Sequence, residues 1–489
     1  MTLHSLRWRE PYWIFFISLV YFALNALRLT RVPRVWQDEV QDVEPAFNLL
    51  LGHGLTSAAH PYIGFGDFFS GPPLFFLMLW SWMEVFGFSI ESVRWFDVTV
   101  AWGSAIALVI AVRRSGLLKE KYSRISFFTV VLMGVALTGV YANTRYDLSA
   151  IFVLSIAALF YSHLGRQGKL AAVFACAVIL PFANYLALIY FGFLVLTLAF
   201  YERSMARDLM LAGIAGAMTG VILLFASFYL MDVLAGFGTS LVHASTNWGS
   251  LTTKFTKGMA LVWSDRSAFI LIAFFIVFFI VGVAVNDRDT RNLVVVGLGF
   301  LVLLPPVLYV AVHYTGSYRW MAFFPAFLVA LMLVERVPDR FVKPRTYVLA
   351  LCVILIILPG LPRYVAYAFL EWKELNYDLV EDWVISRVEP SDTILVDAPA
   401  YYPGKQAAGF AYVGCGQTRI PAEKRNTISK AFLDLTRRQD PVAELKEHLG
   451  GHWVLVDELK LERSAMRLAL PPYPKEPYSY HVGYFVPGE

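Results

Sequence analysis

Long apolar stretches alternate with short charged ones along most of the chain. They lie at 11–29, 91–112, 124–142, 148–164, 170–182, 184–200, 208–230, 267–285, 293–312, 320–336 and 346–362. A helix that crosses about 30 Å of hydrocarbon needs about 20 apolar residues, and many of these runs approach that length. The pattern therefore predicts a polytopic α-helical membrane protein with about eleven transmembrane helices.

Basic residues cluster between these runs and indicate the orientation of the chain. The clusters are Arg7 with Arg9, RRSGLLKEKYSR at 113–124, GRQGK at 165–169, ERSMARD at 202–208, NDRDTRN at 286–292 and ERVPDRFVKPR at 335–345. With a cytoplasmic N-terminus, eleven crossings place every cluster on the cytoplasmic side, as the positive-inside rule expects. The external loops would then be 30–90, 143–147, 231–266 and 313–319.

Two places leave the number of crossings open. Segment 72–88 is apolar enough to span, but counting it would export the basic loop 113–124, so we predict an interfacial or re-entrant helix there. Runs 170–182 and 184–200 are short and meet at LPFAN. One long tilted helix over both would break the alternation of sides.

The character of the sequence changes after the last apolar run. Residues 363–489 hold short apolar runs ended by Gly and Pro, as in SRVEPSDTILVDAPAYY and GGHWVLVDE, which is typical of strands. We expect a transmembrane domain at 1–362 and an external soluble α/β domain at 363–489. No internal repeat is evident.

Composition supports the membrane assignment and excludes other classes. The chain is 58% apolar and 16% charged, whereas soluble proteins average about 25% charged residues. Its three cysteines form no CxxC metal motif and no disulfide framework. Residues 11–29 end without a small-residue cleavage site, so they are predicted to be a helix and not a signal peptide. The net charge of +4 gives no reason to expect a nucleic-acid partner.

Candidate catalytic residues gather on the predicted external face. Asp38 and Glu39 follow the first apolar run, Arg145 and Asp147 precede the fourth, and Arg319 precedes the tenth. Ionisable residues at membrane depth are costly and are usually functional. Arg319 can also be read as a snorkelling interfacial arginine, and Asp147 as a helix N-cap.

The stretch WQDEVQDVEPAFNLLLGHG at 36–54 places four acids beside the membrane. Pro45 suits the first position of a helix, so PAFNLLL is predicted to be a short surface helix. Asp38 and Glu39 would stand before it in a half-dry site, where desolvation suits a carboxylate to act as a general base. Asp42 and Glu44 would be ordinary acids at the helix terminus.

Four stretches, in order, resemble the GT-C glycosyltransferases, in the branch of the lipid A aminoarabinose transferases and protein O-mannosyltransferases. They are DEVQDVEPAFNLLLGHG, FFSGPPLFFLMLWSWMEVFGFSIESVRWFDVTVAW, TGVYANTRYDLSAIFVLSIAALFY and GSYRWMAFFPAFLVAL. The similarity covers most of residues 30–335 and adds an external tail like those of the family. It implies a GT-C fold and a polyprenyl-phosphate-linked sugar donor used outside the cytoplasm.

The resemblance also implies roles for single residues. Asp38 matches the acid that the family uses as catalytic base, Glu39 its neighbour and rival, and Asp147 the second acid of the site. Arg319 lies in the arginine–aromatic segment and becomes a candidate phosphate contact. We add His313 and Tyr318 beside it, and Arg145, Lys254 and Lys257 as other external cations.

The chain departs from the family pattern at two positions. Gly71 stands where relatives often carry a lysine before the Pro pair, so the charge that meets the donor phosphate must come from elsewhere. Pro45 lies where relatives usually have an unbroken helix.

The combined prediction is an inverting hexosyl or pentosyl transferase of the inner (plasma) membrane, with its active site on the external face. Asp38 would take a proton from an acceptor hydroxyl on a lipid, glycan or protein. A transporter or lipid flippase is the alternative, although such proteins often show internal repeats and midplane charges. A third is an inactive scaffold. No cofactor is required; a divalent metal held by Asp38 or Glu39 with Asp147, aided by His53, His60 or His313, is conceivable.

Overall fold

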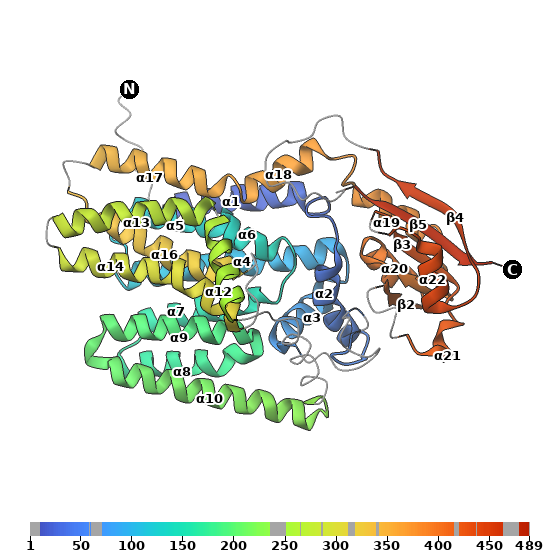
Figure 1. Ribbon diagram of the computed structural model, residues 1–489, viewed down its shortest axis with the longest axis horizontal. Helices are drawn as coiled ribbons and strands as arrows, with labels where there is room; N and C mark the ends of the chain where they lie inside the picture. Colours follow the sequence, from blue (N-terminus) through green and yellow to red (C-terminus); the bar gives the residue numbers. More distant parts are fainter. Residues whose placement is uncertain are drawn as a thin grey trace.

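The computed structural model describes residues 10–57, 59, 71–234, 251–264, 266–284, 287–311, 318–338, 342–414, 420–436, 438–462 and 479–488. Helices fill one part of the molecule, and a sheet with its own helices forms the other (Figure 1). The helices of the first part are α1 (Glu10–Arg28), α2 (Gln37–Leu50), α3 (Pro73–Phe86), α4 (Ile90–Arg114), α5 (Lys121–Met133), α6 (Val135–Tyr141), α7 (Asp147–His163), α8 (Arg166–Ala183), α9 (Tyr185–Tyr201), α10 (Ala206–Leu230), α12 (Leu251–Ser264), α13 (Arg266–Ala284), α14 (Arg288–Leu298), α15 (Leu304–Ala311), α16 (Arg319–Glu335), α17 (Val342–Ile357) and α18 (Leu361–Leu370).

Each predicted apolar run coincides with a helix or with two consecutive helices. By length and apolar composition, six of the described helices can cross a membrane, or seven if the bent pair α17 and α18 is one span. Helices such as α7 and α9 have 17 residues and are shorter than a typical crossing. The prediction of eleven crossings therefore stays a prediction, while the helical architecture is confirmed.

The alternative of one long helix over 170–200 is wrong. α8 ends at Ala183 and α9 begins at Tyr185, with Asn184 between them in an extended conformation. The Asn184 side chain accepts a hydrogen bond from the Leu186 N–H, which is the geometry of an N-cap. The two helices then pack side by side (Figure 1).

Helix α2 begins earlier than its sequence suggested. It runs from Gln37 to Leu50 with Pro45 inside it, so the predicted start at Pro45 is wrong. A proline in a helix interior removes one backbone hydrogen bond and costs about 3 kcal/mol. Burial of Val40, Val43 and Phe47 on the same helix offsets that cost. All four acids of this stretch therefore lie on one continuous helix.

The second part contains a five-stranded mixed sheet in the order β2-β1-β3-β5-β4. The strands are β1 (Thr393–Val396), β2 (Phe410–Val413), β3 (Lys430–Asp434), β4 (Trp453–Lys460) and β5 (His481–Pro487). β1 pairs in parallel with β2 and β3, whereas β5 pairs antiparallel with β3 and β4. Helices α19 (Tyr377–Ile385), α20 (Tyr401–Ala407) and α22 (Pro441–Leu449) accompany it. The strand pattern of the tail thus forms an α/β arrangement; the boundary at 362/363 and its external placement remain predictions.

Candidate active site

Asp38 lies in the first turn of α2 and is partly open to solvent. Its side chain is 42% exposed, the highest exposure in the acidic cluster around Arg145. Its Oδ2 atom is 3.3 Å from Nη1 of Arg145, which lies 107 residues away in the turn before α7. Asp38 is thus held by one long contact and keeps accessible surface.

Arg145 joins Asp38 to the second predicted acid. Its Nε donates to Oδ2 of Asp147 at 3.0 Å, and its side chain is 12% exposed. Asp147 is the first residue of α7 and is fully buried; Tyr146, not Asp147, occupies the N-cap position. Asn184 donates to the other Asp147 oxygen at 2.6 Å. One guanidinium therefore lies between two carboxylates brought together from α2 and α7.

Tyrosines and a third acid enclose the guanidinium. It faces the rings of Tyr146 and Tyr318 at 5.8 and 6.0 Å, and the two hydroxyls lie 3.3 Å apart. Burial raises the pKa of Tyr146 to about 12, so its hydroxyl stays neutral. Asp42 is also buried here; burial raises its pKa well above the ordinary value, although the Arg145 charge opposes this shift. The prediction that Asp42 is an ordinary solvated acid is wrong.

Glu39, the neighbour of Asp38, points into a different environment. It is fully buried, and Arg94 of α4 donates to its two oxygens at 3.0 and 2.8 Å. Tyr402 of α20 donates to Oε1 at 3.0 Å. Arg94 also donates to the Leu29 carbonyl at 2.7 Å. Glu39 therefore links α4 to the sheet-containing part of the chain, and Arg94 adds a contact to the residue that follows α1.

Glu44 lies further along α2 and, like Glu39, is buried against α20. Its side chain is 1% exposed, and it accepts hydrogen bonds from Tyr401 at 2.7 Å and Lys405 at 2.9 Å. Both partners belong to α20. The prediction that Glu44 is an ordinary helix-terminus acid is therefore wrong, because it is a buried contact to the other part of the molecule.

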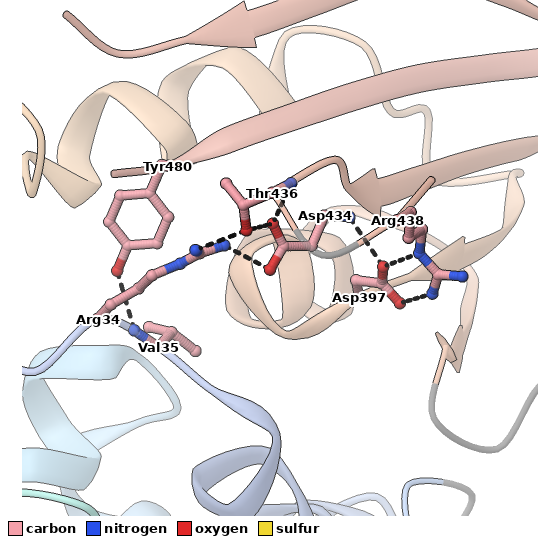
Figure 2. A network of polar contacts seen from close by, with 7 residues as sticks. All are labelled: Arg34, Val35, Asp397, Asp434, Thr436, Arg438 and Tyr480. Carbon is pink, nitrogen blue, oxygen red and sulfur yellow. Dashed lines mark hydrogen bonds and ion pairs between the residues drawn. The ribbon is translucent and has the colours of Figure 1, made fainter. Parts of the chain in front are cut away.

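The segment that leads into α2 is also held by residues of the sheet-containing part of the chain. Arg34 donates to Asp434 at 2.5 Å and to Thr436 at 3.0 Å, and the Val35 N–H donates to the Tyr480 hydroxyl at 2.9 Å. Figure 2 shows these contacts together. Asp397 accepts a hydrogen bond from the Asp434 N–H and binds Arg438 through both oxygens (Figure 2). A cavity of about 270 Å³ lies between these side chains and the first turn of α2. The position of Asp38 thus depends on contacts with residues about 400 positions away.

The other predicted cations lie on different elements. Lys254, half-buried, and Lys257, exposed, belong to α12, which packs on α15. Arg319 is the first residue of α16, half-buried, and follows Tyr318. His313 and His60 fall outside the described residues, and His53 is exposed after α2. Of these predicted contacts, Tyr318 is the residue placed directly against the Asp38–Arg145–Asp147 cluster.

In the part of the chain that the structure describes, no group of three or more His, Cys, Asp or Glu side chains is arranged to hold a metal ion. The position between Asp38 and Asp147 is taken by the Arg145 guanidinium. This arrangement supplies positive charge to both carboxylates.

Reasoning from the sequence missed Arg94, Asn184 and Asp42. Arg94 had a detectable signal, because a cation at the start of an apolar run must find a partner. Asn184 had a weaker signal, because it is a polar residue between two apolar runs. No local signal marks Asp42, since its burial depends on the packing of α2.

No family model matches the sequence, and no curated protein matches it. Two solved structures of ArnT from Cupriavidus metallidurans are similar in fold. The one bound to undecaprenyl phosphate has 13% identity over 96% of this chain and 98% of that chain, with a TM-score of 0.56. The apo structure has 12% identity over 97% and 98%, with a TM-score of 0.59. An Archaeoglobus fulgidus oligosaccharyltransferase in complex with Zn and sulfate has 11% identity over 86% and 68%, with a TM-score of 0.45. The chain therefore shares the fold of ArnT, which confirms the GT-C fold that the resemblance of its sequence predicted.

Proposed function

We propose that this protein is an integral membrane glycosyltransferase that moves a sugar from a polyprenyl-phosphate-linked donor to an acceptor hydroxyl on the external face of the membrane. The observation that carries the proposal is the bridge from Asp38 through Arg145 to Asp147. The ArnT fold supports it, and one of the ArnT structures holds undecaprenyl phosphate. A lipid-linked donor also supplies activated sugar where no nucleotide sugar exists.

In this proposal Asp38 is the general base. It removes the proton of the acceptor hydroxyl, and the oxygen attacks the anomeric carbon as the bond from that carbon to the phosphate oxygen breaks. The electron pair leaves with polyprenyl phosphate, and a single displacement inverts the anomeric carbon. A base must reach the proton that it takes, and the 42% exposure of Asp38 allows that contact, whereas Glu39 is enclosed.

Arg145 has two tasks in this mechanism. Its contact at 3.3 Å holds the Asp38 carboxylate in position. Its Nε and Nη1 atoms have carboxylate partners, while Nη2 is engaged by none of the described residues and can meet the leaving phosphate. Asp147 and Asn184 hold the guanidinium in place. The acceptor class, whether lipid, glycan or protein, stays a matter for assay.

The proposal is tested by transfer from a panel of polyprenyl-phosphate sugars with the purified full-length protein. We expect transfer from at least one donor, with inverted product, and a loss of about 10²–10⁴-fold in turnover in Asp38→Asn. Asp208→Asn is the matched control, since this acid lies on α10 in an exposed pair with Arg166. Normal turnover in Asp38→Asn contradicts the role of Asp38. Export of intact lipid-linked sugar without transfer indicates a flippase instead.

A further inference from the structure

Thr144, which directly precedes Arg145, has an unusual backbone. Its φ is +44°, in the left-handed region that β-branched residues rarely adopt. The residue is fully buried in the turn between α6 and α7. Such a conformation persists only where surrounding contacts hold it, and these positions are concentrated at functional sites. A specific contact is therefore expected to hold the Thr144 backbone in this conformation.

That contact is a hydrogen bond to an acid inside a membrane-spanning helix. The Thr144 hydroxyl donates to Oδ2 of Asp97 at 2.6 Å. Asp97 is fully buried in α4, one helix that is long and apolar enough to cross the membrane. A buried acid in an apolar helix is costly to keep and indicates a specific use.

The two arginines near Asp97 hydrogen-bond to other groups. Arg28 donates to Asn25 and to the Val32 carbonyl, and Arg94 donates to Glu39 and to the Leu29 carbonyl. The second Asp97 oxygen, Oδ1, is buried without a hydrogen-bond partner among the described residues. The hydrogen bond that Asp97 makes in the structure thus goes to the turn that carries Arg145.

We propose that Asp97 and Thr144 are positioning residues that set the Arg145 guanidinium between Asp38 and Asp147. Asp97 anchors the hydroxyl of Thr144, the anchor holds the left-handed backbone, and that backbone directs the next side chain toward α2. A misplacement of about 1 Å of a catalytic group costs up to about 10²-fold in rate. This inference rests on the proposed function, because Arg145 is the group through which both residues act.

The first experiment compares Thr144→Val, which keeps the shape and removes the hydroxyl, with Thr144→Ser, which keeps the hydroxyl. Thr129→Val on α5 is the matched control, since among the described residues the Thr129 hydroxyl donates to the Ile125 carbonyl of its own helix. Each full-length variant is assayed for sugar transfer and for binding of undecaprenyl phosphate. We expect Thr144→Val to lose about 10–100-fold in turnover, and Thr144→Ser and Thr129→Val to stay within about threefold of the parent.

The second experiment separates positioning from general stability. In a double-mutant cycle, Thr144→Val is combined with Arg145→Ala. If Thr144 acts through Arg145, its substitution costs little more once Arg145 is gone. If the two losses multiply, Thr144 acts independently and the inference is wrong. Equal turnover in Thr144→Val and Thr129→Val also overturns it.

Asp97 provides an independent check in case Thr144→Val folds poorly. Asp97→Asn keeps an oxygen that can accept from Thr144, whereas Asp97→Ala removes it. We expect Asp97→Asn to retain most of the turnover and Asp97→Ala to match Thr144→Val. Equal losses in both Asp97 variants contradict the inference. A parent protein that neither transfers sugar nor binds undecaprenyl phosphate contradicts the proposed function, and this inference with it.

Discussion

The two sides of α2 show how differently neighbouring carboxylates are used in one helix. Asp38 keeps 42% of its side chain exposed and meets Arg145 at 3.3 Å, whereas Glu39 is enclosed and meets Arg94 at 3.0 and 2.8 Å. Adjacent helix residues point about 100° apart, which is enough to separate the two environments. We infer that Asp38 reacts and that Glu39 holds the helix in place.

The same division extends one turn further along the helix. Asp42 lies with Asp38 near Arg145, while Glu44, like Glu39, accepts a hydrogen bond from a tyrosine of α20. Asp38 and Asp42 therefore face the proposed reaction and are called the reactive side, whereas Glu39 and Glu44, called the fastened side, bind the sheet-containing part of the chain. Substitutions on the two sides should have different consequences, for activity on one and for stability on the other.

The largest effect is expected from Arg94→Ala on the fastened side. It leaves Glu39 buried without its cation, and breaking a buried pair costs about 3–5 kcal/mol. The measurement is the free energy of unfolding of the purified protein in detergent. Arg387→Ala is the control, because its partner Asp457 is 44% exposed and such pairs contribute about 0–1 kcal/mol. Equal losses in both variants would show that Glu39 does not depend on Arg94.

Arg145→Lys tests the reactive side. A lysine keeps the charge but loses the fork that reaches two carboxylates. We expect turnover to fall about 10²–10³-fold, equivalent to about 2.7–4 kcal/mol of transition-state stabilisation, with the protein still folded. Arg166→Lys, in an exposed pair on the cytoplasmic side by prediction, is the control. A lysine variant with parental turnover would mean that the bridge geometry is unimportant.

These two predictions rest on residues that the sequence located unequally. The apolar runs predicted nearly every helix of the first part, because helix formation there is dictated by local periodicity and length. Asp38, Arg145 and Asp147 were brought together because all three flank apolar runs on one face. Arg94 escaped notice because its partner Glu39 depends on how α2 and α4 meet, and Asn184 because its partner Asp147 depends on how α7 packs against α8.

The prediction that α2 begins at Pro45 failed for a physical reason. Pro45 usually marks a first turn, but here burial of the residues around it outweighs the lost hydrogen bond. The roles of Glu39 and Glu44 could not be read locally either, because Tyr402 and Tyr401 lie 363 and 357 residues away. Contacts over such separations leave no periodic signal in a single sequence.

Tyr401→Phe tests the contacts of the fastened side with a smaller expected loss of stability. It removes the hydroxyl that donates to Glu44 and leaves the Lys405 contact in place. A hydrogen bond to a charged group contributes about 1.5–3 kcal/mol. We expect a loss of that order in the free energy of unfolding, with turnover per folded protein near the parent. Tyr347→Phe on α17, where the side chain is exposed, should change neither quantity. A loss of turnover larger than the loss of folded protein would show that the fastened side also serves the reaction.

The smallest effect concerns pH and Asp42. Burial raises the pKa of Asp42, so the folded protein keeps a proton that the unfolded chain has lost. Between the ordinary pKa of aspartic acid and the raised value, folding binds more protons, and stability falls as the pH rises. The slope is at most about 1.4 kcal/mol per pH unit. Asp42→Asn should remove this slope from the pH profile of the thermal midpoint, whereas Asp382→Asn on α19 should not. If the slope of the thermal midpoint against pH is unchanged in Asp42→Asn, the slope comes from another titrating group.

The division of labour between adjacent acids is tested most directly by single-turnover sugar transfer in Asp38→Asn and Glu39→Gln, each normalised to folded protein. The account predicts that Asp38→Asn loses about 10²–10⁴-fold in rate. It predicts that Glu39→Gln, although less stable, transfers sugar at close to the parental rate per folded molecule. A slow Glu39→Gln beside a normal Asp38→Asn would contradict it, because the reactive base would then be the enclosed acid.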